Sequence, residues 1–488
     1  MRDMFTRATV PRCRTDSSLG SLGFAGGSGR AFKRHLAMEL YLSLGSPRRP
    51  IVLFLTVAWL YLLLLSGTCG FAEQRFPPPD FENGHQLPVT TTPPARAFVL
   101  EYLDVVILGA CLSFGSWLVY IKRSRKGLVA LSIFSLVYFG FWGRGCICSI
   151  GSLQNICLAL ADQTCLVPVT VLVFFALPLL FALFAGRTFC AAVCPHGVLQ
   201  DLVLLKPIKL PPWLEQALSI FPFVYLGLGV LFATTGSAFI ICQYDPFVPI
   251  FRINGRAVMV ASGIALLLVG IFVGRPFCRF LCPYGALLKI GAAVAKWRVR
   301  ITPNQCTQCR LCETSCPFGA LRRPENPTLE PRHLARDRRR LACLVMIFPL
   351  LLGVGGWLGW KFSVPASMMH PSVQLAERLV RAPETGFKAG PLSPDDLALE
   401  RARRNPTEIF AAAKLVRRKF SMGSTIFGVW VGLVIGVKLI SLSVYRRRID
   451  YEPDSGDCFA CARCFEYCPN ELIRRGIAPP VTVPASVD

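Results

Sequence analysis

The sequence GRPFCRFLCPYGALLKI occupies residues 274–290, and CTQCRLCETSCPFG follows at residues 306–319. The second stretch holds four cysteines at 2-2-3 spacing before Pro317, namely Cys306, Cys309, Cys312 and Cys316. This spacing is the bacterial-type ligand run of [4Fe–4S] clusters, and soft thiolate sulfur suits iron. A structural zinc site is the alternative, although zinc ligands ordinarily come as two separated Cys-x2-Cys pairs. The sequence therefore predicts an iron–sulfur cluster here.

The same run occurs a second time, close to the C-terminal end of the sequence. Its cysteines precede Pro469 and are Cys458, Cys461, Cys464 and Cys468. In two-cluster ferredoxins the fourth cysteine of each run ligates the other cluster. We therefore expect two [4Fe–4S] clusters, with Cys468 completing the first set and Cys316 completing the second. This exchange requires both runs to lie on one side of any membrane.

The composition is that of a polytopic membrane protein. Of 488 residues, 53% are hydrophobic and 17% are charged, and the mean hydropathy is +0.48. The net charge of +24 fits basic cytoplasmic loops, and we find no nucleic-acid-binding motif. Eight of the 21 cysteines belong to the two runs, which argues against a secreted disulfide framework.

Apolar stretches predict an all-α fold of about eight transmembrane helices with a cytoplasmic ferredoxin-like module. The expected spans are 51–67, 102–121, 128–142, 166–185, 214–235, 257–273, 341–360 and 425–444. We divide the chain into a basic tail (1–50), two spans with a periplasmic loop (51–127), duplicated hairpins (128–300), the first cluster segment (301–340), a helix pair with periplasmic segment 361–421 (341–446), and the second cluster segment (447–488). Most basic segments fall on the side of the cluster runs, which predicts that this side is cytoplasmic.

A shorter motif, Gly-Arg-x-Phe-Cys-x3-Cys-Pro-x-Gly, occurs at residues 186–197 and again at 274–285. This repeat indicates an internal duplication of a helical-hairpin unit. The two copies bring four cysteines, enough for a further iron centre: Cys190, Cys194, Cys278 and Cys282. Redox-active thiol pairs, or helix-end packing without a metal, are the alternatives.

Two other groups of residues have open alternatives. The cysteines expected in periplasmic loops would form disulfides or a periplasmic metal or redox site: Cys146, Cys148, Cys157, Cys165 and Cys242. Arg187 and Arg275, from the repeated motif, would either reach lipid headgroups or compensate for the charge of an anionic centre.

The motifs together resemble the NosR/NapH-type polyferredoxin membrane proteins. The resemblance covers roughly Leu128 to Glu471 and rests on paired Cys-x3-Cys-Pro motifs followed by two ferredoxin-type runs. It implies membrane electron transfer in the service of a respiratory system. The sequence departs from NosR itself, because it has neither a flavin-attachment Ser-Gly-Ala-Thr motif nor a Cys-x2-Cys-His haem site. Flavin would then enter only through a partner protein.

The sequence thus predicts an integral-membrane electron-transfer component rather than a stand-alone catalyst. It would pass electrons between a cytoplasmic donor or quinone pool and a periplasmic or membrane redox partner, in the cytoplasmic membrane of a bacterium. The hydrocarbon core of a bilayer is about 30 Å thick, so a relay is required. The alternatives are a maturation or metal-reducing accessory factor for a respiratory enzyme, and a membrane redox sensor.

Overall fold

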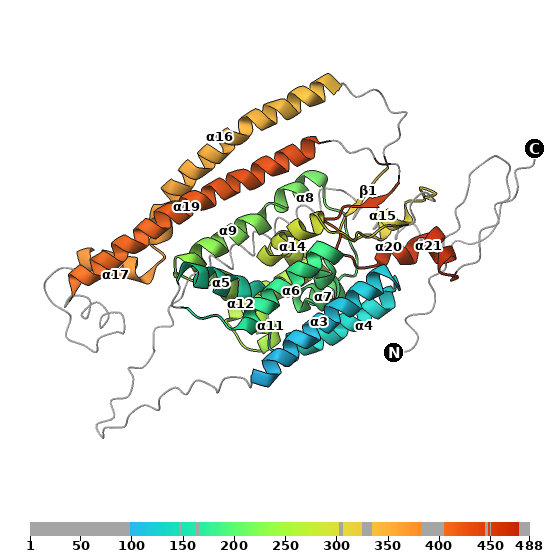
Figure 1. The fold of residues 1–488 in the computed structure, drawn as a ribbon, viewed down its shortest axis with the longest axis horizontal. Coiled ribbons are helices and arrows are strands. Elements are labelled where there is room, and N and C mark those ends of the chain that lie inside the picture. The colour runs from blue at the N-terminus through green and yellow to red at the C-terminus, as the bar shows by residue number, and fades with distance from the viewer. Residues whose placement is uncertain are drawn as a thin grey trace, which may run out of the picture. The chain divides into compact units, whose positions relative to one another are not determined.

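The computed structural model describes residues 98–145, 149–162, 165–301, 306–324, 334–381, 405–444, 448 and 450–477. Within these residues the regular structure is mostly helical, with one two-stranded sheet (Figure 1). The expected basic tail at 1–50 and the expected first span at 51–67 lie outside the described residues.

Four stretches of described helix are long and apolar enough to cross a membrane. They are Val99–Tyr120 in α3 (Phe98–Tyr120), Pro212–Thr234 across α8 (Pro212–Leu218) and α9 (Phe221–Thr234), Arg338–Ser367 in α16 (Leu334–Ser367), and Pro406–Ser443, which is α19. They match the expected second, fifth, seventh and eighth spans, although α16 and α19 extend well beyond the predicted limits. The chain is therefore a membrane protein whose described part has four helices of spanning length.

The third, fourth and sixth expected spans correspond to helices that are shorter than those four or change type along their length. The third consists of α4 (Arg125–Ser135), which continues as the π-helix η1 (Leu136–Trp142) and so begins before the predicted residue 128. The fourth and sixth correspond to α6 (Val169–Ala185) and α12 (Ala257–Gly270). At 1.5 Å per residue, α12 is about 21 Å long, which is less than the hydrocarbon core. Apolar composition alone did not reveal that α12 stops before the predicted residue 273.

Each copy of the repeated motif begins a new helix at the same place. After α6 come the short π-helix η2 (Phe189–Val193) and α7 (Pro195–Leu202), and after α12 come α13 (Pro276–Phe280) and α14 (Pro283–Ala293). Cys194 and Cys282 are the N-cap residues of α7 and α14, and proline follows each of them. Proline favours the first helical position because its fixed φ is already helical and it lacks the N–H that would go unpaired. The Cys-Pro pair is thus a helix start.

The connecting segments fold back toward these helix starts. Residues 149–161, predicted as part of a cysteine-rich loop, form α5 (Ser149–Ala161), which packs against α6 and α9. Between α9 and α12 lie α10 (Ile240–Gln243) and α11 (Val248–Arg252), and α11 packs against α12 and η1. Phe251 of α11 is 2% exposed. The sequence predicted only a loop at α10 and α11, because short helices carry too little apolar periodicity to be recognised.

Helices α16 and α19 pack against each other along their length (Figure 1). Gly355 and Gly359 of α16 face Gly428 of α19 so closely that a Cβ at any of the three would meet backbone atoms of the other helix. Small residues allow such close approach between membrane helices. Helix α17 (Pro371–Arg381) packs on the first half of α19, and the Nε1 atom of Trp430 in α19 donates to the Phe223 carbonyl of α9.

The two cluster runs form one small module beside the membrane helices. Helix α15 (Leu311–Ser315) of the first run packs against α20 (Arg463–Tyr467) of the second, and α21 (Pro469–Arg474) follows. Strand β1 (Leu321–Arg322) pairs antiparallel with β2 (Glu452–Pro453), with Leu321 opposite Pro453. Because the two runs meet directly, they lie on the same side of any membrane.

Candidate iron–sulfur sites

The two cluster runs share one backbone conformation. The second and fourth residues after each first cysteine are left-handed: Gln308 and Ala460 have φ of 54°, and Arg310 and Ala462 have φ of 61°. Alternating left- and right-handed residues aim backbone N–H groups into a concavity that favours anions, including iron–sulfur clusters. In the second run the Ala460 N–H donates to the Cys458 sulfur at 3.4 Å.

The fourth cysteine of each run lies with the other run. Burial raises the pKa of Cys312 to about 11, with the thiols of Cys468, Cys309 and Cys306 adding to the effect. Burial likewise raises the pKa of Cys464, and here the thiol neighbours include Cys458, Cys461 and Cys316. The thiols are thus brought together in the two sets that an exchange of fourth ligands requires.

Among the described residues, no three His, Cys, Asp or Glu side chains converge closely enough to hold one metal ion. A [4Fe–4S] cluster takes its protein ligands as cysteine thiolates.

The cysteines of the repeated motif form a third set of four thiols. Cys190, Cys194, Cys278 and Cys282 are each about 95% buried. Burial raises the pKa of Cys194 well above its usual range, and the thiols of the other three cysteines reinforce the effect. The two motif copies, far apart in the sequence, therefore place all four thiols around one buried point.

Gln200 in α7 belongs to this third thiol set, although sequence reasoning did not single it out. Its amide Nε2 donates to the Cys278 sulfur at 3.3 Å and to the His196 carbonyl at 2.9 Å, while its Oε1 accepts from the Phe277 N–H at 3.0 Å. Gln200 is fully buried. Gln200 lies four residues after His196, so the sequence alone could have placed it on the same helix face as His196 of the motif. Nothing in the sequence marked it as a contact of the other motif copy.

A buried His–Asp pair lies beside the same set. The Nε2 atom of His196 is 3.1 Å from Oδ2 of Asp245, a residue of the segment before α11. Burial alone would raise the pKa of Asp245, but His196 and the N–H groups of Phe247 and Val248 outweigh it and lower the pKa. His196 thus fixes the segment that returns before α11 against the repeated motif.

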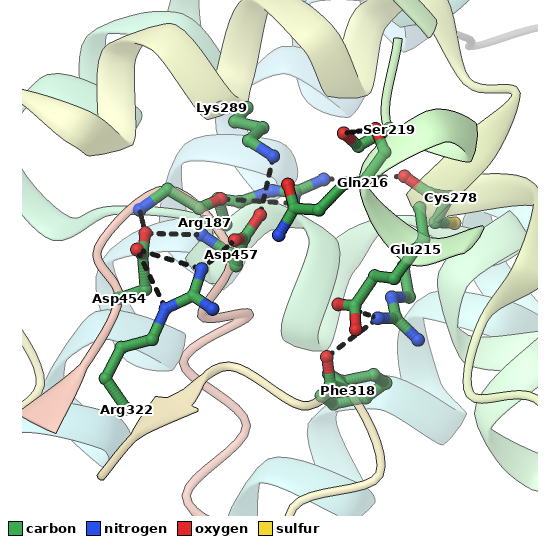
Figure 2. A network of polar contacts seen from close by, with 12 residues as sticks. Arg187, Glu215, Gln216, Ser219, Cys278, Lys289, Phe318, Arg322, Asp454 and Asp457 are labelled. Carbon is green, nitrogen blue, oxygen red and sulfur yellow. Dashed lines mark hydrogen bonds and ion pairs between the residues drawn. The ribbon is translucent and has the colours of Figure 1, made fainter. Parts of the chain in front are cut away.

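Ion pairs fasten the cluster module to the membrane helices (Figure 2). The Arg279 guanidinium of α13 donates to Oε1 of Glu215 at 2.6 Å and to the Phe318 carbonyl at 2.8 Å. Figure 2 also shows Asp457, the residue before Cys458, contacted by Lys289 and Arg322. Burial would raise the pKa of Asp457, but Lys289, Arg322 and Lys438 outweigh it and lower the pKa to about 2. The aspartate is thus held as an anion.

The remaining candidate cysteines do not gather in the described part of the chain. Cys157 and Cys165 are partly buried, and Cys242 is exposed near Gly151 and Gln154. Cys146 and Cys148 lie outside the described residues. The expected periplasmic disulfides or redox site therefore stay predictions, and none of the described candidates forms a disulfide.

Comparison with known proteins identifies the same segments. A family model described as a 4Fe–4S binding domain matches residues 167–213 and 256–302, the two motif copies. A second 4Fe–4S binding domain model matches residues 298–321, the first cluster run. The chain therefore has iron–sulfur cofactors. No solved structure matches the chain.

Relatives with known sequences place the chain in a family. It is 30% identical to Uncharacterized protein MJ0750 of Methanocaldococcus jannaschii, over 37% of this chain and 77% of the relative. It is 29% identical to Protein NirI of Paracoccus denitrificans, over 41% of this chain and 31% of NirI, and 27% identical to Regulatory protein NosR of Pseudomonas aeruginosa, over 41% and 30%. Further relatives have names of electron-transport and ferredoxin-type proteins.

The chain belongs to the NosR/NapH-type family of ferredoxin-like membrane proteins. It covers most of the archaeal relative but only about a third of NirI and NosR. Its class is therefore that of a membrane iron–sulfur protein related to electron-transport components.

Proposed function

We propose that this protein transfers electrons between a cytoplasmic donor or the quinone pool and a redox partner in the membrane or periplasm. The observation that carries the proposal is the meeting of two ferredoxin-type runs that are far apart in the sequence, with the fourth cysteine of each run near thiols of the other run. Bound [4Fe–4S] clusters would supply one-electron redox chemistry. The protein would supply thiolate ligands, burial and hydrogen bonds to sulfur, which set reduction potentials.

The residues that would hold the two ferredoxin-type clusters follow from the thiol neighbours. The first set is Cys306, Cys309, Cys312 and Cys468, and the second is Cys458, Cys461, Cys464 and Cys316. We place both sets at the cytoplasmic face of a bacterial inner membrane. Support comes from the exposed Arg338, Arg339 and Arg340, which begin the spanning part of α16 shortly after the first run.

The third thiol set is the best-placed relay into the membrane helices. It lies where α6 and α12 end, and Arg187 beside it contacts the second run through Phe459. The segment that includes Asp245 and α11 folds back to the same point. The segment that precedes α12 therefore reaches the thiols that lie where α12 ends. This arrangement shortens the path that an electron would need to travel. We propose that this set holds a further iron centre.

Metal analysis of the full chain tests both parts of the proposal. Anaerobically purified protein should contain about eight iron atoms per chain for two [4Fe–4S] clusters, and more if the third set is also occupied. The Cys190→Ser and Cys278→Ser variants should lose iron and acid-labile sulfide while they keep the electron paramagnetic resonance (EPR) signals of the two ferredoxin-type clusters. An unchanged iron content in these variants would refute the proposed third centre. Fewer than about eight iron atoms in the unaltered protein would count against two full [4Fe–4S] clusters.

The accessory and sensor functions are the second candidate, because one relative is named a regulatory protein. The electron-transfer proposal includes a quinone or a flavin-domain protein as redox partner, whereas the accessory and sensor functions require neither. Stopped-flow reduction followed by reoxidation with a quinone analogue would separate the candidates. An electron carrier should cycle at turnover rates, whereas an accessory factor should leave its partner enzyme synthesised but without its cofactor.

A further inference from the structure

The arginines of the two motif copies cross over to each other's cysteines. Arg275, from the second copy, donates to the backbone carbonyl of Cys190 in the first copy, and to the Ala191 carbonyl at 3.3 Å. Arg187, from the first copy, donates to the Cys278 carbonyl of the second copy at 3.5 Å. Each guanidinium therefore fastens the first cysteine of the opposite copy, and both lie against the third thiol set.

The same two arginines also reach the second cluster run. The Arg187 guanidinium lies 4.0 Å from the ring centroid of Phe459, and the Arg275 guanidinium lies 5.3 Å from it. Phe459 directly follows Cys458 and is 1% exposed. Arg187 further donates to the Gly456 carbonyl at 3.4 Å. The arginine pair thus stands between two thiol sets that have no sequence motif in common beyond Cys-x3-Cys-Pro.

The positive charge of Arg187 and Arg275 is not balanced by the carboxylates around them. Arg187 is 4% exposed and Arg275 is 0% exposed. Asp201 is the carboxylate near Arg275, and it also pairs with Arg125 and Arg463. Among the described residues, no carboxylate forms an ion pair with Arg187, and the Nε atoms of both arginines lack a hydrogen-bond partner. A buried cation is costly unless an anion compensates for it.

We propose that Arg187 and Arg275 are positioning residues that compensate for the negative charge of the iron–sulfur centres on either side, and thereby raise the reduction potentials of both centres. The inference rests on the proposed function and adds a role for residues that bind no metal. Iron coordinated by four thiolates is anionic, and one more electron makes it more so. A cation in a low-dielectric setting stabilises the reduced state more than the oxidised state. Removal of the cation should therefore lower the potential.

The expected effect is local. The charge of Arg187 opposes the burial that raises the pKa of Cys278 and Cys458. At Cys312, of the first set, burial and then neighbouring thiols account for the raised pKa. The potential of the set that contains Cys306 should accordingly change least. The two centres that flank the arginines should change together, because one charge lies between them.

The test is an EPR-monitored redox titration of the full chain, purified anaerobically in detergent, with iron and sulfide counted in each sample. Arg187→Gln should keep its iron and make the flanking centres at least tenfold harder to reduce, which is about 59 mV for a one-electron couple. Arg187→Lys keeps the charge and should remain closer to the unaltered protein. The matched control is Arg323→Gln, because the Arg323 side chain is 66% exposed and its charge is screened by solvent.

The outcomes separate this inference from the proposed function. If Arg187→Gln loses iron, the inference requires Arg187→Lys to retain it, because charge rather than shape is the cause. Loss of iron in both variants, or unshifted potentials in an iron-replete Arg187→Gln protein, would overturn the inference and leave the electron-transfer proposal intact. An unaltered protein without iron would instead defeat the proposed function itself.

Discussion

The Nζ atom of Lys289 lies 2.6 Å from Oδ1 of Asp457. Lys289 belongs to α14, which begins at the second Cys-x3-Cys-Pro motif, and Asp457 directly precedes Cys458 of the second run. The side chains are 27% and 29% exposed, so the pair is partly shielded from solvent. One ion pair therefore joins the helix of the third thiol set to the loop that would hold a ferredoxin-type cluster.

Loss of this ion pair should loosen the second run. We expect Lys289→Met and Asp457→Asn each to destabilise the docked module by about 1–2 kcal/mol, because a partly buried charged hydrogen bond is removed. The double variant should be little worse than Asp457→Asn alone, which also loses the ion pair with Arg322. Thermal unfolding in detergent, with iron retention as a second measurement, checks this double-mutant cycle. Strict additivity of the two substitutions would show that the pair contributes nothing. Lys296→Met is the control, because Lys296 is exposed on the segment just after α14.

The exchange of fourth ligands predicts which cysteines share a spectroscopic signal. Cys306→Ala and Cys468→Ala should abolish the same EPR signal, although these residues lie in different runs. Cys458→Ala and Cys316→Ala should abolish the other signal. The result that contradicts the exchange is a shared loss in Cys306→Ala and Cys316→Ala, which would mean that each run holds its own cluster.

The ligand runs were predictable from sequence because their information is local. Spacing of 2-2-3 followed by proline predicts that three cysteines of a run bind one iron–sulfur cluster and the fourth binds its neighbour, and the recurrence of that spacing from Cys458 predicts the second set. The repeated Gly-Arg-x-Phe-Cys motif likewise predicted that Cys190 and Cys278 occupy equivalent positions in the two copies. In each case a short stretch of chain contains the whole pattern.

Other features could not be predicted because they depend on contacts between distant segments. Hydropathy gives the apolar stretch that includes α12 but not the residue at which the helix stops. Seven of the eight expected spans fall in the described part, where four helices have spanning length. Asp245 and Gln200 look like ordinary loop and helix residues in the sequence. Their roles appear only when the chain returns to the motif, since packing between segments carries that information.

The hydrogen bond from Gln200 to the Cys278 sulfur should tune the third centre. Hydrogen bonds to cluster sulfurs raise the reduction potential, because they stabilise the more negative state. We expect Gln200→Met to lower the potential of that centre by roughly 40 mV, which corresponds to about 1 kcal/mol for a one-electron couple. Redox titration checks the shift. Gln216→Met is the control, because Gln216 of α8 lines the same opening as Cys278, whereas the amide that bonds to the Cys278 sulfur is that of Gln200. A change in the two ferredoxin-type signals instead would contradict the assignment.

The glycine contact between α16 and α19 should be essential for keeping the second run in place. A Cβ at Gly428 would meet the backbone of Gly355 and Gly359, and neither helix can yield without separating from the other. Gly428→Ala should therefore destabilise the helix pair by about 1–3 kcal/mol, the usual cost of overpacking. Gly353→Ala is a matched control on α16, because a Cβ there meets nothing within 4 Å and alanine favours a helix. Because α19 and β2 are the elements that precede the second run, Gly428→Ala should also lose iron from the set that contains Cys458 on heating, before the third set does. Equal thermal stability of the two alanine variants would show that the close helix contact does not hold the module.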